Sequence, residues 1–229
     1  MQYYELVCTA YLLEDVHYTY SNQMLSSFIN KAMFLDGELA ERHKKNTFKH
    51  YVFSSLFPVD KESKTYHAGN VYVFRVRSLD RNMILKFKNL FPDIRGGLKV
   101  IASEIKVQKY RFINELTTIT PALATVEGKH WIRDDDIILL QERMQINLLK
   151  KYNDFFNEAL QPSGSFIQGL YILNHKPIAL NYKDTKLIGN KFKLAVNQDE
   201  CSQRLAFIAM AEGLLEKNSS AGLGFCSAK

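Results

Sequence analysis

The sequence has few cysteines and no long apolar run. Its three cysteines, Cys8, Cys201 and Cys226, are odd in number and far apart, and no C-x-x-C pair or Cys/His set has the spacing of a zinc site. No apolar run approaches the ~20 residues of a membrane-spanning helix, and Glu5 interrupts the N-terminus before a signal peptide could form. We therefore expect a cytoplasmic protein with reduced thiols and without a metal, a cofactor or a membrane partner.

Charge and composition indicate a folded protein with a polyanion as a candidate partner. Apolar residues make up 46% of the 229 residues, which is enough for a core. The formal net charge is +6, a modest basic excess that suits a nucleic acid without requiring one. The length fits one large domain or two small ones.

The first half of the chain alternates between strand and helix patterns. Residues 71–78 (VYVFRVRS) alternate between two faces as a strand does, whereas residues 22–35 place their apolar side chains on one helical stripe. The full series predicts strands at 3–12, 50–57, 71–78 and 98–112 and helices at 22–35, 37–45 and 81–91. The order β-α-β-β-α-β is that of a ferredoxin-like or RNA-recognition-motif domain.

A second unit of the same kind follows. A strand at 117–126 is interrupted by Pro121, and apolar residues spaced by four and three predict a helix that includes Leu140 and Phe155. We therefore predict an α+β fold of two tandem ferredoxin-like (RNA-recognition-motif-like) domains, 1–115 and 116–229, with a C-terminal glycine-rich loop. The remaining expected elements are strands at 165–173, 177–182, 190–197 and 221–228 and a helix at 200–215.

The C-terminal segment is rich in glycine. Gly213, Gly222 and Gly224 surround the polar run 216–220 (EKNSS), which matches neither the P-loop pattern nor the G-x-G-x-x-G pattern of dinucleotide sites. Backbone N–H groups of such a segment can approach phosphates closely. Taken alone, a helix cap at Gly213 followed by a tight turn explains the segment equally well.

The segment EGLLEKNSSAGLGF (212–225) resembles the C-terminal signature of the CRISPR-associated endoribonucleases that cut repeat RNA into guide RNAs. This is the sixth CRISPR-associated family, within the RAMP superfamily. Leu215 departs from its pattern, which has glycine there, and the spacing before Gly222 is one residue longer than usual. The resemblance implies that the loop holds RNA through Gly213, Lys217, Asn218, Ser219, Gly222 and Gly224.

The N-terminal half resembles the same family. ELAERHKKNTFKHYVFSSLF (38–57) matches its stretch of helix, histidine, a lysine six residues on, and an aromatic strand. His43 and Lys49 fall at the matching positions, and the similar stretches extend from about residue 20 to 225.

The resemblance implies metal-independent cleavage by the 2′-hydroxyl of the RNA, which leaves a 2′,3′-cyclic phosphate and a 5′-hydroxyl. A histidine suits the proton transfer because its pKa lies near ~6.5, so we assign that task to His43. Lys49 would stabilise the anionic phosphorane. Many relatives add a tyrosine from the first helix, where this chain has Asn30. We include Asn30 as the third catalytic candidate, because it could donate a hydrogen bond although it cannot readily act as an acid. Protonation of the leaving oxygen is then left to Lys49 or water. His50, beside Lys49, is the rival histidine.

The remaining lysines of interest lie between two predicted strands. Lys186, Lys191 and Lys193 flank Gly189 in a candidate hairpin that would form a track for RNA phosphates. An ordinary solvated face accounts for them as well.

Three functions stay open at this point. The first is processing of CRISPR repeat RNA, and the second is a catalytically inactive RAMP-type guide-RNA-binding subunit of an effector complex, which Asn30 and Leu215 favour. The third is an unrelated tandem ferredoxin-like enzyme acting on a small phosphorylated ligand. The partners expected from the resemblance are CRISPR repeat RNA and other effector-complex subunits, and a homodimer is left open.

Overall fold

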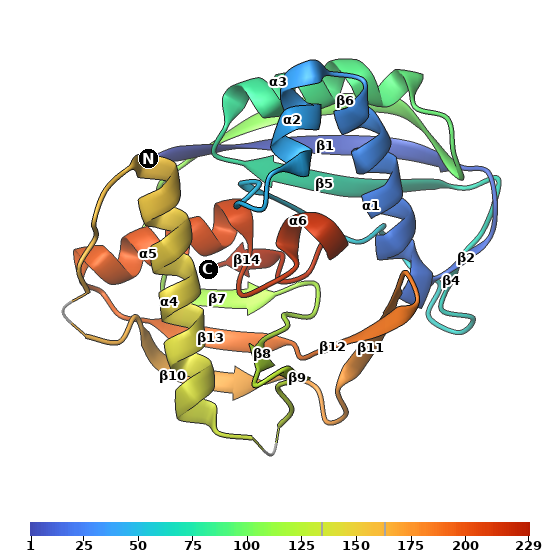
Figure 1. Cartoon of the computed structure of the whole chain (residues 1–229). Helices are drawn as coiled ribbons and strands as arrows, with labels where there is room; N and C mark the ends of the chain where they lie inside the picture. The colour runs from blue at the N-terminus through green and yellow to red at the C-terminus, as the bar shows by residue number, and fades with distance from the viewer. Residues whose placement is uncertain (134, 163) are drawn as a thin grey trace.

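A computed structural model describes residues 1–133, 135–162 and 164–229. Its first half is a four-stranded antiparallel sheet in the order β3-β5-β1-β6, with the first strand in the centre (Figure 1). This is the ferredoxin-like order that the sequence predicts. The elements are β1 (Gln2–Leu12), β2 (Val16–His17), α1 (Tyr18–Phe34), α2 (Gly37–Lys44), β3 (Tyr51–Phe53), β4 (Thr65–Tyr66), β5 (Val71–Ser78), α3 (Arg81–Leu90), the 3₁₀ turn η1 (Phe91–Asp93) and β6 (Leu98–Lys109).

The second half repeats this arrangement. Its sheet has the order β10-β13-β7-β14, again with the first strand in the centre, which confirms the tandem ferredoxin-like fold. The second sheet begins at Glu115, and the division into 1–115 and 116–229 stays a prediction. The elements are β7 (Glu115–Thr118), α4 (Ile137–Phe156), β10 (Ile167–Ile172), β13 (Phe192–Val196), α5 (Glu200–Glu212), α6 (Asn218–Ala221) and β14 (Cys226–Ala228).

Two short ribbons complete the second half and correct the sequence prediction. The ribbon of β8 (Thr125–Val126) and β9 (Lys129–His130) takes up the end of the strand expected at 117–126, because the chain leaves the sheet before Pro121. The prediction of a hairpin turn around Gly189 is wrong. The ribbon of β11 (Ile178–Tyr182) and β12 (Thr185–Gly189) turns earlier, and Gly189 packs on the backbone of Ala122.

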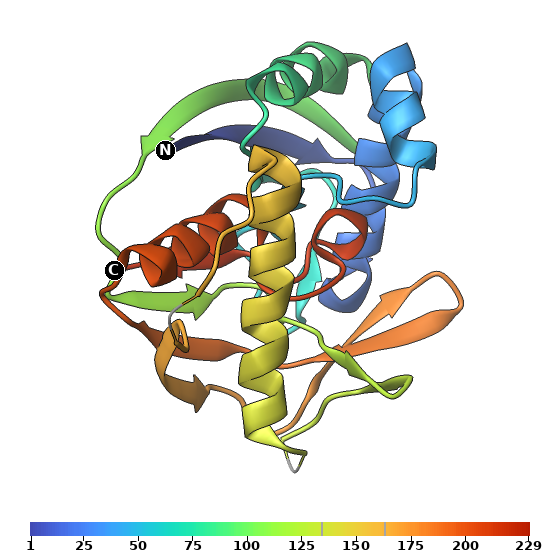
Figure 2. The same ribbon diagram turned by 60° about the vertical axis from the view of Figure 1, so that its left-hand side comes forward.

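Helices cover one face of each sheet, and each half has its own apolar core. Buried side chains of α1 and α3 pack on β1 and β5 in the first half, and those of α4 and α5 pack on β7 and β13 in the second. Figure 2 shows α4 running alongside the second sheet toward the first half. None of the helices within the described residues is long and apolar enough to cross a membrane.

A buried arginine joins the two halves. The Nε atom of Arg77, on β5, lies 2.5 Å from a carboxylate oxygen of Glu5, and Nη1 donates to the carbonyl of Cys226 at 2.7 Å. The guanidinium also lies 4.1 Å from the centroid of the Phe225 ring. These contacts attach the C-terminal strand to the first sheet and satisfy a charge pair that would be costly to bury alone.

The chain between α5 and β14 needs its glycines for packing against the protein itself. Gly222 and Gly224 have φ angles of 63° and 68°, in the left-handed region that favours glycine. A Cβ atom on Gly222 would lie 2.5 Å from the Phe53 ring, and one on Gly224 would lie 2.0 Å from the carbonyl oxygen of Leu214. The glycines therefore let this segment close against both halves.

We expect Gly224→Ala to lower the free energy of unfolding by about 3 kcal/mol, because backbone strain and overpacking each cost ~1–3 kcal/mol. Gly128→Ala is the matched control, since Gly128 also has a positive φ, 79°, but its Cβ would enter open space. Urea unfolding measures both variants. Equal losses would show that the close contact to Leu214 carries no cost of its own.

Candidate functional site

A polar pocket of about 430 Å³ lies where the two halves meet. One wall is formed by the loop 46–50 between α2 and β3 with Tyr51 at the start of β3, and the opposite wall is the segment 215–220 after α5. Asn147 and Lys151 of α4 line it as well, and the Oδ1 atom of Asn147 is buried without a hydrogen-bond partner among the described residues. Four of the residues predicted from the sequence line this pocket: Lys49, Lys217, Asn218 and Ser219.

Lys151 organises the wall formed by the segment after α5. Its buried ammonium donates to the carbonyls of Gly213 at 2.7 Å and Leu215 at 3.0 Å and to Oδ1 of Asn218 at 2.7 Å, which uses all three of its protons. Burial lowers the pKa of Lys151 to about 8. The Nδ2 atom of Asn218 donates in turn to the carbonyls of Leu214 at 3.1 Å and Leu223 at 2.8 Å.

Helix α1 fixes the other side of the same segment. The side chain of Asn22 donates to the carbonyl of Ala221 at 2.8 Å, and the Ser26 hydroxyl donates to the carbonyl of Ser220 at 2.5 Å. The segment is therefore tied to both halves of the protein. Gly213, Asn218, Gly222 and Gly224 are buried in this junction, whereas Lys217 is exposed and Ser219 is half-buried.

His43 lies in the last turn of α2, in surroundings that disfavour a charged ring. Its imidazole contacts the Phe34 ring of α1 edge-on, with 4.9 Å between centroids. Asn30 is one turn before Phe34 and so occupies the same face of α1. Burial, followed by the positive charges of Lys49 and Lys183, lowers the pKa of His43. The structure thus places His43 near Lys49, whose charge acts on it, and neither His43 nor Asn30 is among the residues that line the pocket.

The side chain of Lys49 caps the C-terminal end of α2. Its ammonium donates to the carbonyl of Arg42 at 2.6 Å and also to that of Lys45, groups that a helix end leaves without intrahelical partners. An ammonium has three protons, so one remains for another acceptor. Burial and the charge of Arg42 lower the pKa of Lys49.

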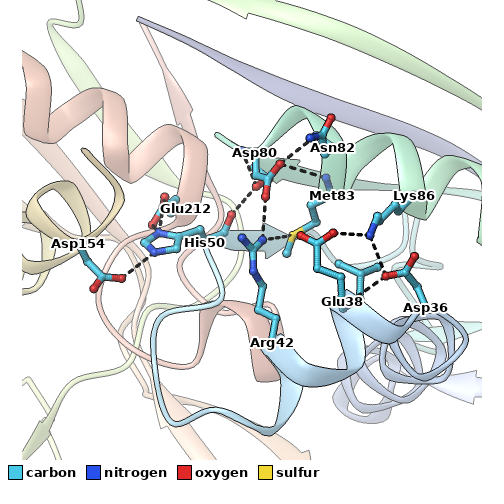
Figure 3. A network of polar contacts seen from close by, with 12 residues as sticks. Asp36, Glu38, Arg42, His50, Asp80, Asn82, Met83, Lys86, Asp154 and Glu212 are labelled. Atoms are coloured by element: carbon cyan, nitrogen blue, oxygen red, sulfur yellow. Dashed lines mark hydrogen bonds and ion pairs between the residues drawn. The ribbon is translucent and has the colours of Figure 1, made fainter. Parts of the chain in front are cut away.

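His50 lies between two carboxylates. Its Nδ1 atom is 2.9 Å from Glu212 on α5, and its Nε2 atom is 2.8 Å from Asp154 on α4 (Figure 3). Burial opposes the charged form, but the hydrogen bonds and charges of Glu212 and Asp154 outweigh it and raise the pKa of His50. Both ring nitrogens are therefore occupied, and the two histidines of this region have opposite electrostatic surroundings.

Lys191 and Lys193 are not among the residues that line the pocket. Lys193 lies on β13 of the second sheet and forms an ion pair with Glu115 at 2.8 Å, and Lys191 immediately precedes that strand. Lys191 is half-buried, and burial lowers its pKa. The candidate phosphate track of the sequence is thus separate from the pocket.

Lys151, Asp154 and Glu212 were missed by the sequence analysis. Lys151 was detectable, because it falls between Leu148 and Tyr152 on the apolar stripe of α4, where a lysine is out of place. Within the described residues, no group of three or more His, Cys, Asp or Glu side chains is arranged to hold a metal ion.

No protein-family model and no curated protein sequence matches the chain. Solved structures match it over nearly its full length. A CRISPR-associated protein Cas6 is 21% identical with a TM-score of 0.72, and the match covers 99% of each chain. This chain has the Cas6 fold. The product of a Cas6-related gene from Pyrococcus furiosus is 17% identical, with a TM-score of 0.69 over 100% of this chain and 98% of that one. A RAMP protein described as binding different RNA substrates is 16% identical, with a TM-score of 0.74 over 99% of each chain.

The buried ammonium that shapes this Cas6-type junction generates a prediction. We expect Lys151→Met to lower the free energy of unfolding by at least about 2 kcal/mol, because it leaves three buried acceptors unpartnered at ~1–3 kcal/mol each. Lys150→Met is the control, since Lys150 is the exposed neighbour on the same helix. Chemical unfolding compares the two, and a Lys151→Met protein as stable as the Lys150→Met protein would contradict this role.

Proposed function

We propose that the chain is a Cas6-family endoribonuclease that cuts CRISPR repeat RNA into guide RNAs. The observation that carries the proposal is the fold, which the chain shares over essentially its whole length with a Cas6, the product of a Cas6-related gene and a RAMP protein that binds different RNA substrates. The matches of His43 and Lys49 to the family's sequence pattern support it independently. A cytoplasmic location is part of the same proposal.

His43 is the general base in the proposed reaction. It takes the proton of a 2′-hydroxyl, whose oxygen then attacks the adjacent phosphorus. The bond to the 5′-oxygen breaks, giving a 2′,3′-cyclic phosphate and a 5′-hydroxyl. The lowered pKa of His43 supports this role, because a base must be uncharged at the working pH. Water protonates the leaving oxygen in this scheme, since Asn30 stands where relatives have a tyrosine.

Lys49 stabilises the charge that develops on the phosphorane. Two of its three protons bind the end of α2, which fixes the direction of the third. A fixed donor aimed at developing charge needs no reorganisation during the reaction. His50 is the poorer base because Glu212 and Asp154 occupy both of its ring nitrogens.

The RNA-binding residues follow from the shape of the pocket wall. Lys217 and Ser219 present polar groups at its surface, whereas Gly213, Asn218, Gly222 and Gly224 shape the wall from within. Lys191 and Lys193 are kept as a second contact for RNA outside the pocket. No cofactor takes part in this scheme.

A catalytically inactive guide-RNA-binding RAMP subunit is the second candidate. Asn30 favours it, because an amide cannot act as a general acid in place of the tyrosine. Such a subunit would bind repeat RNA, and other effector-complex subunits or a second copy of this chain, without cutting. Cleavage in the presence of EDTA separates the two candidates.

The decisive substrate carries a 2′-deoxy nucleotide immediately upstream of the scissile phosphate. We expect the all-ribose repeat RNA to be cut in EDTA and the deoxy RNA to stay intact, because the nucleophile is missing. Gel analysis of the products and their termini measures both. Equal cutting of the deoxy RNA would contradict 2′-hydroxyl attack, and binding without cutting of either RNA would favour the inactive subunit.

His43→Ala should slow single-turnover cleavage by at least ~10²-fold, the lower end of what general acid–base catalysis contributes. RNA affinity should stay within about threefold, because His43 serves the reaction and carries little charge at neutral pH. Filter binding and rapid mixing measure the two quantities. If a His50 variant lost more activity than His43→Ala, the base would be assigned to the wrong histidine.

A further inference from the structure

The loop between His43 and β3 ends at a residue with an unusual backbone. His50 has a φ angle of 55°, a left-handed conformation that costs a non-glycine residue roughly 1–2 kcal/mol. Its carbonyl accepts a hydrogen bond from the Ser78 hydroxyl at 2.5 Å, and its side chain is 9% exposed. Such strain persists where the surroundings over-determine the conformation.

The side chain of His50 supplies that constraint. It links the first half to α4 through Asp154 and to α5 through Glu212. The rings of Phe48 and Phe155 lie beside it, with centroids at 6.1 Å and 5.2 Å. One imidazole thus connects the loop to two helices of the other half.

This arrangement requires a charged ring. A carboxylate only accepts hydrogen bonds, and a neutral imidazole has a single N–H donor, so only the imidazolium can donate to both acids. On deprotonation, one of the two contacts becomes a repulsion between lone pairs. The other charged groups that line the same pocket are Lys49, Lys151, Glu216 and Lys217.

Helix α2, which precedes the loop, is fixed to the first half by ion pairs. Arg42 of α2 binds Asp80 at 2.8 Å, and Lys86 of α3 binds Asp36 at 2.8 Å and Glu38 at 2.7 Å (Figure 3). These contacts position α2 and hence His43. Lys49 is adjacent to His50, so the contacts of His50 with Asp154 and Glu212 place Lys49 relative to the wall formed by Lys217 and Ser219.

We propose that His50, held between Asp154 and Glu212, is a positioning residue that sets Lys49 and the loop 46–50 against the second half for cleavage. This inference rests on the proposed function. It assigns the two histidines different tasks: His43 must be uncharged to accept a proton, and His50 must be charged to keep the loop in place.

The two tasks predict a bell-shaped pH dependence of the cleavage rate. The rising limb follows deprotonation of His43 and lies below the ordinary value of about 6.5, because the pKa of His43 is lowered. The falling limb includes deprotonation of His50 above that value, because the pKa of His50 is raised. Lys151, with a pKa of about 8, also loses its proton on this side, so the contribution of His50 is the part of the limb that moves when Asp154 is changed. The contacts of His50 with Asp154 and Glu212, which we call the clamp, also contribute to stability. This contribution is complete below about pH 6.5 and is lost as the pH rises through the folded-state pKa of His50.

The test is single-turnover cleavage of repeat RNA by wild-type protein and Asp154→Asn across both limbs. The amide keeps the shape and one acceptor but removes the charge, so the falling limb should move down by about one pH unit. Rates would then fall about tenfold on that limb and stay within about twofold near the optimum. Glu41→Gln is the control for loss of an acidic charge near α2, because Glu41 pairs with Lys44 on the same helix. Its profile should match the wild type.

A second measurement needs no RNA and separates the clamp from the proposed activity. Histidine titration by NMR, with hydrogen exchange of residues 46–51 followed in parallel, should show protection factors, corrected for the intrinsic pH dependence of exchange, that fall as His50 deprotonates. Asp154→Asn should shift that transition to lower pH. If the protein shows this transition but does not cleave the RNA, the proposed function is wrong and the clamp is still supported. The inference would be overturned if an active Asp154→Asn protein kept the wild-type falling limb. It would also be overturned if the exchange of residues 46–51 did not change as His50 titrates.

Discussion

The junction of the two halves depends on the hydrogen bonds that the buried ammonium of Lys151 donates. The ammonium donates hydrogen bonds to two carbonyls of the turn after α5 and to the side chain of Asn218. That turn then forms one wall of the pocket and receives Asn22 and Ser26 from α1. Two ferredoxin-like units are thereby joined through hydrogen bonds to backbone carbonyls, a geometry that tolerates little displacement.

Charge distinguishes the two histidines near the pocket, where His50 is a lining residue and His43 is not. His43 and His50 are seven residues apart, yet their surroundings differ in kind. Positive neighbours and burial favour the uncharged ring at His43, whereas two carboxylates favour the charged ring at His50. Neighbouring groups thus shift the pKa values of two histidines in opposite directions, which suits the different tasks proposed for them.

The regular elements were predictable because their patterns are local. The alternation in Val71–Ser78 and the helical stripe of α1 are properties of adjacent residues, and their order along the chain indicated the ferredoxin-like sheets. The two-residue strands of β8 and β9 are too short to produce a pattern. The turn of the β11–β12 ribbon was misplaced, because the contact of Gly189 with Ala122 spans 67 residues of sequence.

The candidate site was predictable in part for the same reason. The resemblance to a known family indicated His43, Lys49 and the glycine-rich segment, whose roles stay predictions, but the neighbours of this region come from distant elements. Glu212 and Asp154 meet His50 across 162 and 104 residues, a pairing that no local pattern encodes. The tight contacts of Gly222 and Gly224 are with Phe53 and Leu214, so the reason for these glycines was visible only in the fold.

The central claim is that RNA is cut between the end of α2 and the segment after α5. The most direct measurement is a crystal structure of the protein with a repeat RNA made uncleavable by one 2′-deoxy nucleotide. The account predicts the scissile phosphate within hydrogen-bond reach of His43 and Lys49, with His50 still bound to Asp154 and Glu212. A scissile phosphate bound to His50, or on a face remote from α2, would contradict it.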